Sequence, residues 1–274
     1  MLPECRLNPQ SSVVGYQSVN VENGYSLRTP TFYSVGGGDS ISIQEFKPVG
    51  DSVPTGEDGM TFVQFQLLNA QSRIKDMKTY YWHNWTSVPI FEWEDPVTSY
   101  GWYETVSGQA EGDPSSLMVK PGEAFYMQCP VSEVALSFSG EVRTNQSFLA
   151  VNAGYTLLGN PYPCPISIQS ITPIKAGTEG AEIPTGEDGM TFVQFQLLNA
   201  QSRIKDMKTY YWHNWTSVPI FEWEDPVTSY GWYETVSGQA EGDPSELILQ
   251  PGEGIYVQSP IACLLNIKGL ELSK

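Results

Sequence analysis

The sequence predicts an all-β protein: two tandem β-sandwich or barrel-like modules of about 130 residues, related by internal duplication. The stretch Pro54–Ser115 recurs without a single substitution as Pro184–Ser245, so 62 residues are repeated at an offset of 130. Segments rich in aromatic and β-branched residues are separated by turn signals roughly every ten residues, which is the spacing of sandwiches and barrels. Repetition predicts the module count, and local pattern predicts the strands.

The repeat extends beyond its identical centre. The first copy carries five extra residues within Tyr33–Asp39, and the second recovers five within Ala176–Glu182. Insertions of this kind belong in surface loops, while the framework is kept. We therefore expect module boundaries at 1–142 and 143–274 with no linker between them. The flanking segments that match are Val21–Leu27 with Val151–Leu157, and Leu117–Tyr126 with Leu247–Tyr256.

The elements follow from local chemistry. Thr61–Leu68 and Val134–Ser139 alternate in the manner of strands. Lys120-Pro-Gly-Glu123 predicts a type II turn, because Pro presets φ at the second position and Gly supplies positive φ at the third. We expect this turn to join Leu117–Val119 and Ala124–Gln128 as a hairpin, and to recur at Pro251-Gly252. Asn23-Gly24 suits a tight hairpin turn, and Asn69–Met77 is the one candidate for a short helix.

The composition is strongly acidic, since 14 Lys and Arg against 31 Asp and Glu give a net charge of −17. Such a chain repels phosphates and anionic lipids, so we expect neither a nucleic-acid partner nor membrane insertion. No apolar run has the length of a membrane span. Many Thr, Ser, Asn, Tyr and Gly with few Lys is typical of exported bacterial β-proteins. We expect a secreted or cell-surface protein whose leader is not present in this chain.

The four cysteines lie outside the identical repeat and show no CxxC spacing. With only two His in the chain, a zinc site is not expected. Three interpretations remain open: bridges across the modules, bridges between chains, or plain buried thiols. The residues concerned are Cys5, Cys129, Cys164 and Cys263.

Three strings carry a family resemblance: Gly154-Tyr-Thr-Leu-Leu-Gly-Asn-Pro-Tyr-Pro163, the Gly101-Trp-Tyr103 triplet, and the Pro121-Gly-Glu-Ala-Phe-Tyr126 turn. Together they resemble repeat modules of large secreted surface proteins of Bacteroidetes- and Lentisphaerae-type bacteria. The resemblance covers most of both repeats and implies an exported β-sandwich-like domain, without an assigned activity. The first copy departs from it, with Arg28-Thr-Pro-Thr-Phe32 where the second has Leu158-Gly-Asn-Pro-Tyr162.

An aromatic run is the most suggestive candidate site. On a strand, alternate residues face opposite sides, so one set belongs to the core and the other is exposed or covered by a neighbour. Trp and Tyr planes stack on sugar rings and anchor protein interfaces. We predict a protein or glycan contact here, against the alternative that both faces are buried. The candidates are Tyr80, Tyr81, Trp82, His83 and Trp85, repeated as Tyr210, Tyr211, Trp212, His213 and Trp215.

Other polar motifs are weaker candidates for a functional site. Glu57 and Asp58, repeated as Glu187 and Asp188, lie beside Gly in turns and are candidates for weak Ca²⁺ binding, although they lack the spacing of a calcium loop. Glu92 and Glu94 share one side of a short strand and would not bracket a sugar from both sides, as a glycosidase requires. The sequence has no nucleophile elbow and no phosphate loop. We therefore predict no catalytic residue, no cofactor and no enzymatic activity.

Identical tandem modules can bind multivalently or propagate end to end. The last segment, Leu264–Leu272, resembles Val134–Val142, which feeds the next module. We therefore predict strand pairing between chains. The function predicted is an extracellular structural or adhesive protein that self-associates, including head-to-tail filaments; the alternative is a carbohydrate-binding tandem module. The predicted inter-chain strands contain Val13, Val14, Tyr16, Val19 and Val21, and Leu264, Leu265 and Ile267.

Overall fold

The computed structural model describes residues 14–21, 24–50, 53, 64–67, 78–86, 98–106, 109–110, 115–129, 134–181, 183, 194–197, 208–216, 228–236, 239–240 and 245–270. Their regular structure is β-strand, apart from single 3₁₀ turns at η1 (Ile43–Glu45) and η3 (Ile168–Ser170). The all-β prediction is confirmed. Within these ranges no helix is long and apolar enough to cross a membrane.

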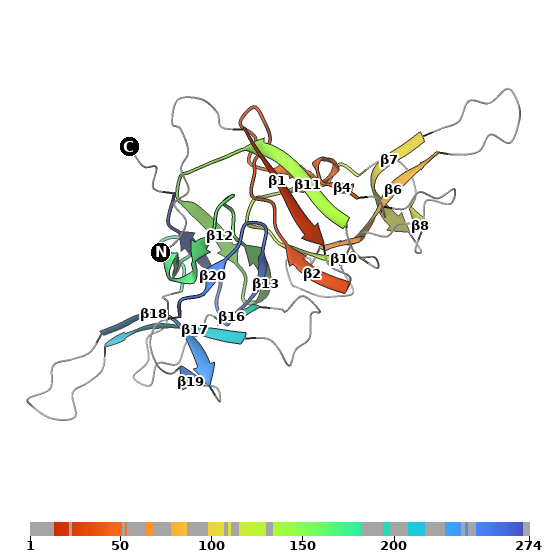
Figure 1. The fold of residues 1–274 in the computed structure, drawn as a ribbon. Helices are drawn as coiled ribbons and strands as arrows, with labels where there is room; N and C mark the ends of the chain where they lie inside the picture. The colour runs from red at the N-terminus through yellow and green to blue at the C-terminus, as the bar shows by residue number, and fades with distance from the viewer. Residues whose placement is uncertain are drawn as a thin grey trace, which may run out of the picture.

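The first half of the chain, β1 to β11, forms a small sheet of order β1-β11-β4 and a large sheet of order β2-β10-β5-β6-β7-β8, while β3 pairs with β9 (Figure 1). Its strands are β1 (Val14–Val21), β2 (Gly24–Arg28), β3 (Ile41–Ser42), β4 (Lys47–Val49), β5 (Gln64–Leu67), β6 (Lys78–Thr86), β7 (Thr98–Val106), β8 (Gln109–Ala110), β9 (Met118–Val119), β10 (Phe125–Cys129) and β11 (Val134–Glu141).

The second half, β12 to β22, repeats this order as a small sheet β12-β22-β15, a large sheet β13-β21-β16-β17-β18-β19 and the pair β14-β20. Its strands are β12 (Ser147–Val151), β13 (Gly154–Gly159), β14 (Ile166–Ser167), β15 (Ile171–Lys175), β16 (Gln194–Leu197), β17 (Lys208–Thr216), β18 (Thr228–Val236), β19 (Gln239–Ala240), β20 (Ile248–Leu249), β21 (Gly254–Ser259) and β22 (Cys263–Ile267).

Each half has its own apolar core, which draws side chains from both of its sheets. In the first half, Phe46 lies 5.3 Å from Phe138 of the small sheet and 5.9 Å from Phe125 of the large sheet, measured between ring centroids. Trp102 is fully buried in the same core, and Trp232 takes the equivalent place in the second half. A third, smaller cluster of Leu27, Ala124 and Leu157 joins the two halves.

The predicted Pro-Gly turns are present, but they do not make hairpins. The Glu123 N–H donates to the Lys120 carbonyl (2.9 Å), and Gly122 has φ +88°, as a type II turn requires. However, β9 pairs with β3, whereas β10 pairs with β2 and β5. A hairpin at Asn23-Gly24 is also wrong, because β1 and β2 belong to different sheets. The proposed helix at 69–77 lies outside the described residues.

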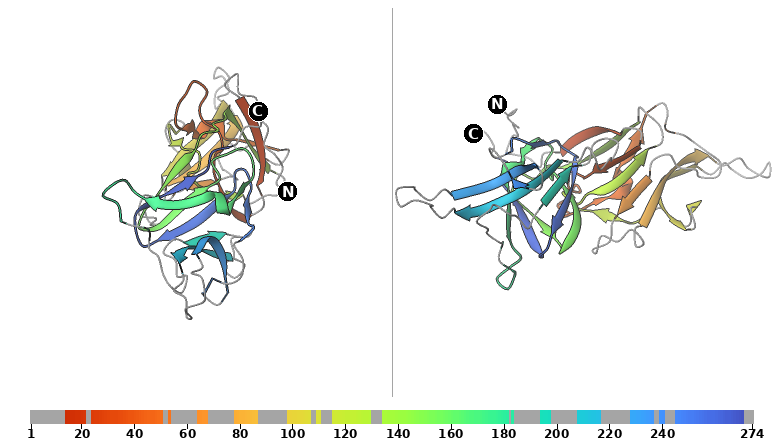
Figure 2. Two further views of the ribbon diagram at one scale, coloured as in Figure 1. Left: turned by 90° about the vertical axis from the view of Figure 1, so that its left-hand side faces the viewer. Right: turned by 90° about the horizontal axis from the view of Figure 1, so that it is seen from below.

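The halves meet near β2 and β21, at the middle of the molecule. The paired strands β6 and β7 lie at one end of the molecule, and the pair β17 and β18, of identical sequence, lies at the opposite end. Figure 2 shows the same opposition from below. The duplicated sequence is thus displayed in two different directions.

Candidate functional site

The aromatic strands β6 and β17 each turn a Tyr and a Trp into the core. Tyr80 is 2% exposed and Trp82 9%, and burial raises the pKa of the Tyr80 phenol to about 12. Tyr210 and Trp212 are buried in the same way. The prediction that these four residues contact a partner or glycan is therefore corrected: they form core, because the rings of Trp82 and Trp102 pack together at 5.5 Å.

The alternate residues of the run face away from that core. Tyr81 and Tyr211 are half-buried on the opposite face, as the predicted alternation requires. The remaining candidates lie in the same strands, but their side chains are outside the described residues. These are His83 and Trp85, with His213 and Trp215.

Strand register places tyrosines and glutamines in a line across each large sheet. Residues that are directly opposite in neighbouring strands share one face of the sheet. We call the two lines the first and second Tyr–Gln rows. The first consists of Tyr25, Gln128, Gln64, Tyr81 and Tyr103. The second consists of Tyr155, Gln258, Gln194, Tyr211 and Tyr233.

The second Tyr–Gln row begins with an accessible ring. Tyr155 is 38% exposed and stacks on Tyr256, with ring centroids 4.7 Å apart and an interplanar angle of 27°. Burial raises the pKa of the Tyr256 phenol to about 12, so it is neutral at physiological pH. Within the row, Tyr155 is exposed and Tyr211 is half-buried, whereas Tyr233 at the other end is buried.

A glutamine clamp holds the buried Trp of each half. Gln44 Nε2 donates to the carbonyls of Trp102 (2.9 Å) and Ser115 (2.8 Å), and its Oε1 accepts from the Trp102 N–H (2.9 Å). Gln169 makes the same three bonds around Trp232. Ser42 caps the turn that presents Gln44. Gln44 and the Trp of the Gly101-Trp-Tyr103 triplet therefore have structural roles, as do Gln169 and Trp232.

One pocket lies between the halves, with a volume of about 510 Å³. It is lined by the first-half loop that follows Tyr33, by the Lys120–Glu123 turn and by β12. Phe148 is 54% exposed on β12, at the edge of this pocket. The lining mixes acidic and basic groups, so it carries no strong net charge.

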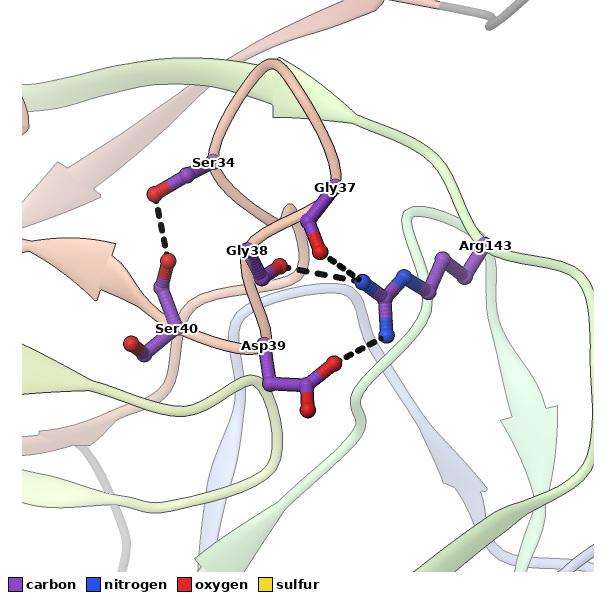
Figure 3. Close-up of polar contacts among 6 residues, drawn as sticks. All are labelled: Ser34, Gly37, Gly38, Asp39, Ser40 and Arg143. Atoms are coloured by element: carbon purple, nitrogen blue, oxygen red, sulfur yellow. Dashed lines mark hydrogen bonds and ion pairs between the residues drawn. The ribbon is translucent and has the colours of Figure 1, made fainter.

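Arg143 organises that pocket. Its Nη1 lies 2.7 Å from Asp39 Oδ1, and its Nη2 donates to the carbonyls of Gly37 (3.2 Å) and Gly38 (3.0 Å), as Figure 3 shows. The guanidinium also sits 4.0 Å from the centroid of the Tyr33 ring, a cation–π contact. Burial raises the pKa of the Tyr33 phenol, and the Arg143 charge opposes this shift.

Sequence reasoning placed the five-residue insertion at Tyr33–Asp39 in a surface loop but missed Arg143. This residue lies two positions after the end of β11, in the connection to β12. A lone Arg between two strands carries no sequence signal of its partner loop, which lies about one hundred residues earlier in the chain. We call Arg143 and residues 37–39 the connector clamp.

The two strands that were predicted to pair between chains differ in whether they have a free edge. β1 contains Val14 and Tyr16, which are 58% and 70% exposed, and among the described residues it pairs only with β11. Leu264, Leu265 and Ile267 lie in β22, which pairs with β12 on one side and β15 on the other. Strand pairing between chains at β22 is therefore ruled out, because both of its edges are occupied. Val13 lies outside the described residues.

Three cysteines are buried thiols: Cys129, Cys164 and Cys263 are 0%, 6% and 1% exposed. Burial raises the pKa of the Cys263 thiol, which keeps it protonated. Cys5 and the Ca²⁺ candidates Glu57, Asp58, Glu187 and Asp188 lie outside the described residues, as do Glu92 and Glu94. Within the described ranges, no three His, Cys, Asp or Glu side chains gather closely enough to hold a metal ion.

Comparison of the chain with protein-family models, with curated proteins and with solved structures gave no match in any of the three.

Proposed function

We propose that the protein is an extracellular structural or adhesive protein of two β-sandwich modules, 1–142 and 143–274, that arose by duplication and self-associate. The observation that carries this proposal is the recurrence of one Tyr–Gln row on two sheets whose β6–β7 and β17–β18 pairs lie at opposite ends (Figures 1 and 2). A surface that is presented twice in different directions can link two partners at once.

The chemistry of the rows suits a protein contact. Tyr is enriched at interfaces because its ring supplies apolar area at low entropic cost and its hydroxyl finds a hydrogen-bond partner. The rows also lie on sheet faces opposite the cores, since Tyr80 and Met127 occupy the core face of the first large sheet. Tyr210 and Val257 occupy the core face of the second. The proposed contact joins a Tyr–Gln row of one chain to a row of another.

Light scattering of the full chain over a concentration series tests this proposal. The wild type is expected to form oligomers that grow with concentration. Tyr81→Ala alone or Tyr211→Ala alone leaves one working row, so growth stops at small oligomers. The double variant is expected to be monomeric. Val35→Ala, at an exposed loop position, is the matched control. A wild type that stays monomeric at high concentration contradicts the proposal, as does a double variant that still associates.

A second candidate function is carbohydrate binding by the same rows. It is favoured by the accessible Tyr155 ring, which shares a row with Gln258 and the half-buried Tyr211. Aromatic planes beside amides are suited to neutral sugars. Intrinsic Trp and Tyr fluorescence titrated with mucin and plant glycans separates this candidate from self-association. A response that Tyr155→Ala and Tyr211→Ala abolish supports it, whereas no response to any glycan excludes it.

A further inference from the structure

The contact between the two halves obeys a local two-fold relation. Arg28 forms a β-bridge with Glu253, and Glu123 forms one with Leu158. At the repeat offset of 130, Arg28 corresponds to Leu158 and Glu123 corresponds to Glu253. Exchanging the two halves therefore turns one bridge into the other. This exchange symmetry defines an isologous interface.

The hydrogen bonds and the packing contacts between the halves also come in pairs that are equivalent when the halves are exchanged. The Thr29 N–H donates to the Gly252 carbonyl (3.2 Å), and the corresponding Gly159 N–H donates to the Gly122 carbonyl (3.0 Å). The space beside Gly122 is filled by Leu149, and the space beside Gly252 by Val19 of the other half. Leu27 and Leu157, also equivalent positions, are 5% and 6% exposed in the cluster between them.

An isologous surface is complementary to the equivalent surface of any other copy. Within one chain, the short connection keeps the two surfaces at high effective concentration, so the intramolecular contact dominates at low protein concentration. Only residues 142–146 connect β11 to β12, and the connector clamp holds this segment against the 37–39 loop. Opening the connection would leave each half with a free surface that fits the other half.

The detailed fit favours unlike halves. A Cβ atom at Gly159 would lie 2.4 Å from Thr29 Cγ2, so position 159 accepts Thr29 only because it is glycine. If the first halves of two molecules met through this surface, Thr29 of one would face Thr29 of the other, and there is no space for both side chains. The preferred partner for a first half is therefore a second half.

From this geometry we infer that the contact is exchangeable between chains: the first half of one molecule binds the second half of another through the surface that they use within one chain. Reciprocal exchange closes a dimer, and successive exchange extends an open chain of molecules. This exchange goes beyond the proposed function, because it uses the surface between the halves instead of the Tyr–Gln rows.

Charge reversal provides the test. Arg28→Glu places two carboxylates at the Arg28–Glu253 bridge, and Glu253→Arg places two guanidinium groups there. Each variant alone is expected to have a weakened internal contact. A 1:1 mixture, after brief warming to open the halves, restores both opposite-charge pairs only in the exchanged dimer. Both chains carry Tyr81→Ala and Tyr211→Ala, so that association through the rows does not contribute.

The expected result is a doubling of the weight-average mass in the mixture, together with a Tm above that of either variant alone. A mixture that keeps the mass and Tm of its separate components overturns the inference. The proposed self-association is unaffected by that outcome, because it is measured on the wild type through the rows.

A second pair of variants serves if charge reversal prevents folding. Arg28→Cys in one chain and Glu253→Cys in another, both in a Cys5→Ser background, bring the thiols together only across an exchanged contact. A disulfide-linked dimer mapped to residues 28 and 253 supports exchange. The control mixture replaces Arg28→Cys by Val35→Cys, at the exposed loop position. Equal dimer yields from both mixtures would overturn the inference.

Discussion

Gln44 and Gln169 each satisfy two backbone carbonyls and one backbone N–H around a fully buried Trp. Gln44→Met keeps the side-chain volume and removes all three hydrogen bonds. We expect a loss of about 2–3 kcal/mol in the free energy of unfolding, since partly buried backbone groups lose their partners. Urea denaturation measures this loss.

Gln169→Met provides the matched test in the second half, and its cost should equal that of Gln44→Met to within about 1 kcal/mol, given the same contacts. A cost below about 0.5 kcal/mol in both variants would show that water replaces the amide without penalty.

Glu253 is the carboxyl at the contact between the halves whose charge is unfavourable. Desolvation raises its pKa, against the opposing influence of the Gln250 N–H and the Arg28 charge. A raised folded-state pKa means that stability is greatest below the unfolded value, near 4.5, and is lost as the pH rises through the folded-state pKa. Glu253→Gln is therefore expected to raise Tm at pH 7, with the gain vanishing near pH 4.

Scanning calorimetry from pH 4 to 8 measures this effect. Glu123→Gln is the control, because Glu123 takes the same turn position in the first half but is exposed. A gain that is equal in both variants, or independent of pH, would contradict burial as the cause.

Residue roles could be predicted from sequence only where the chemistry is local. The alternation of Tyr80, Tyr81 and Trp82 between core and opposite face follows from strand period alone. The roles of Gln44 and Arg143 do not, because their partners are separated from them by 58 and 104 residues. The prediction of an aromatic contact site was wrong for Tyr80, Trp82 and their repeats for a related reason. Periodicity defines the two faces of a strand, but only packing decides which face belongs to the core.

At the scale of elements, the two Pro-Gly turns are the sharpest test of backbone conformation. Gly122 and Gly252 have φ +88° and +75°, where a side chain is strained by about 1–3 kcal/mol. A Cβ at Gly122 would also meet Leu149 Cδ2 at 2.5 Å, whereas one at Gly252 would lie 3.2 Å from Val19 Cγ2. Gly122→Ala should therefore destabilise more than Gly252→Ala.

Gly36→Ala isolates the backbone contribution, since Gly36 has φ +99° and no neighbour within 4 Å of the added Cβ. The three variants should rank Gly36, Gly252, Gly122 in increasing loss of unfolding free energy by urea titration. Any other order would show that strain, packing or both are relieved by movement of the turns.

Strands and turns could be predicted, but pairing partners could not. The Pro-Gly turn has the expected chemistry, yet β9 and β10 leave it for different sheets. β22 resembles β11 in sequence, but both of its edges are occupied, by β12 and β15. Turn geometry is decided by four adjacent residues, whereas sheet order depends on contacts between distant segments, which a single sequence does not reveal.

At the scale of the molecule, the sequence predicted two equal modules and head-to-tail assembly between chains. The contact between the halves is instead two-fold, with Arg28–Glu253 and Glu123–Leu158 as equivalent bridges. Repetition specifies equal parts but not the operation that relates them. That operation becomes visible only in the contact itself, where Thr29 of the first half meets Gly159 of the second.

The connector clamp has a mechanical consequence. A tensile load between the outer ends of β6 and β17 must pass through the contact between the halves and through residues 142–146, in parallel. The ion pair of Arg143 with Asp39 and the backbone bonds of residues 29 and 159 then break before either large sheet unravels. Five freed residues extend by about 17 Å. Single-molecule pulling should record this as a short, low-force first step. The step should be absent when Arg28→Cys and Glu253→Cys are combined in one chain and joined by a disulfide.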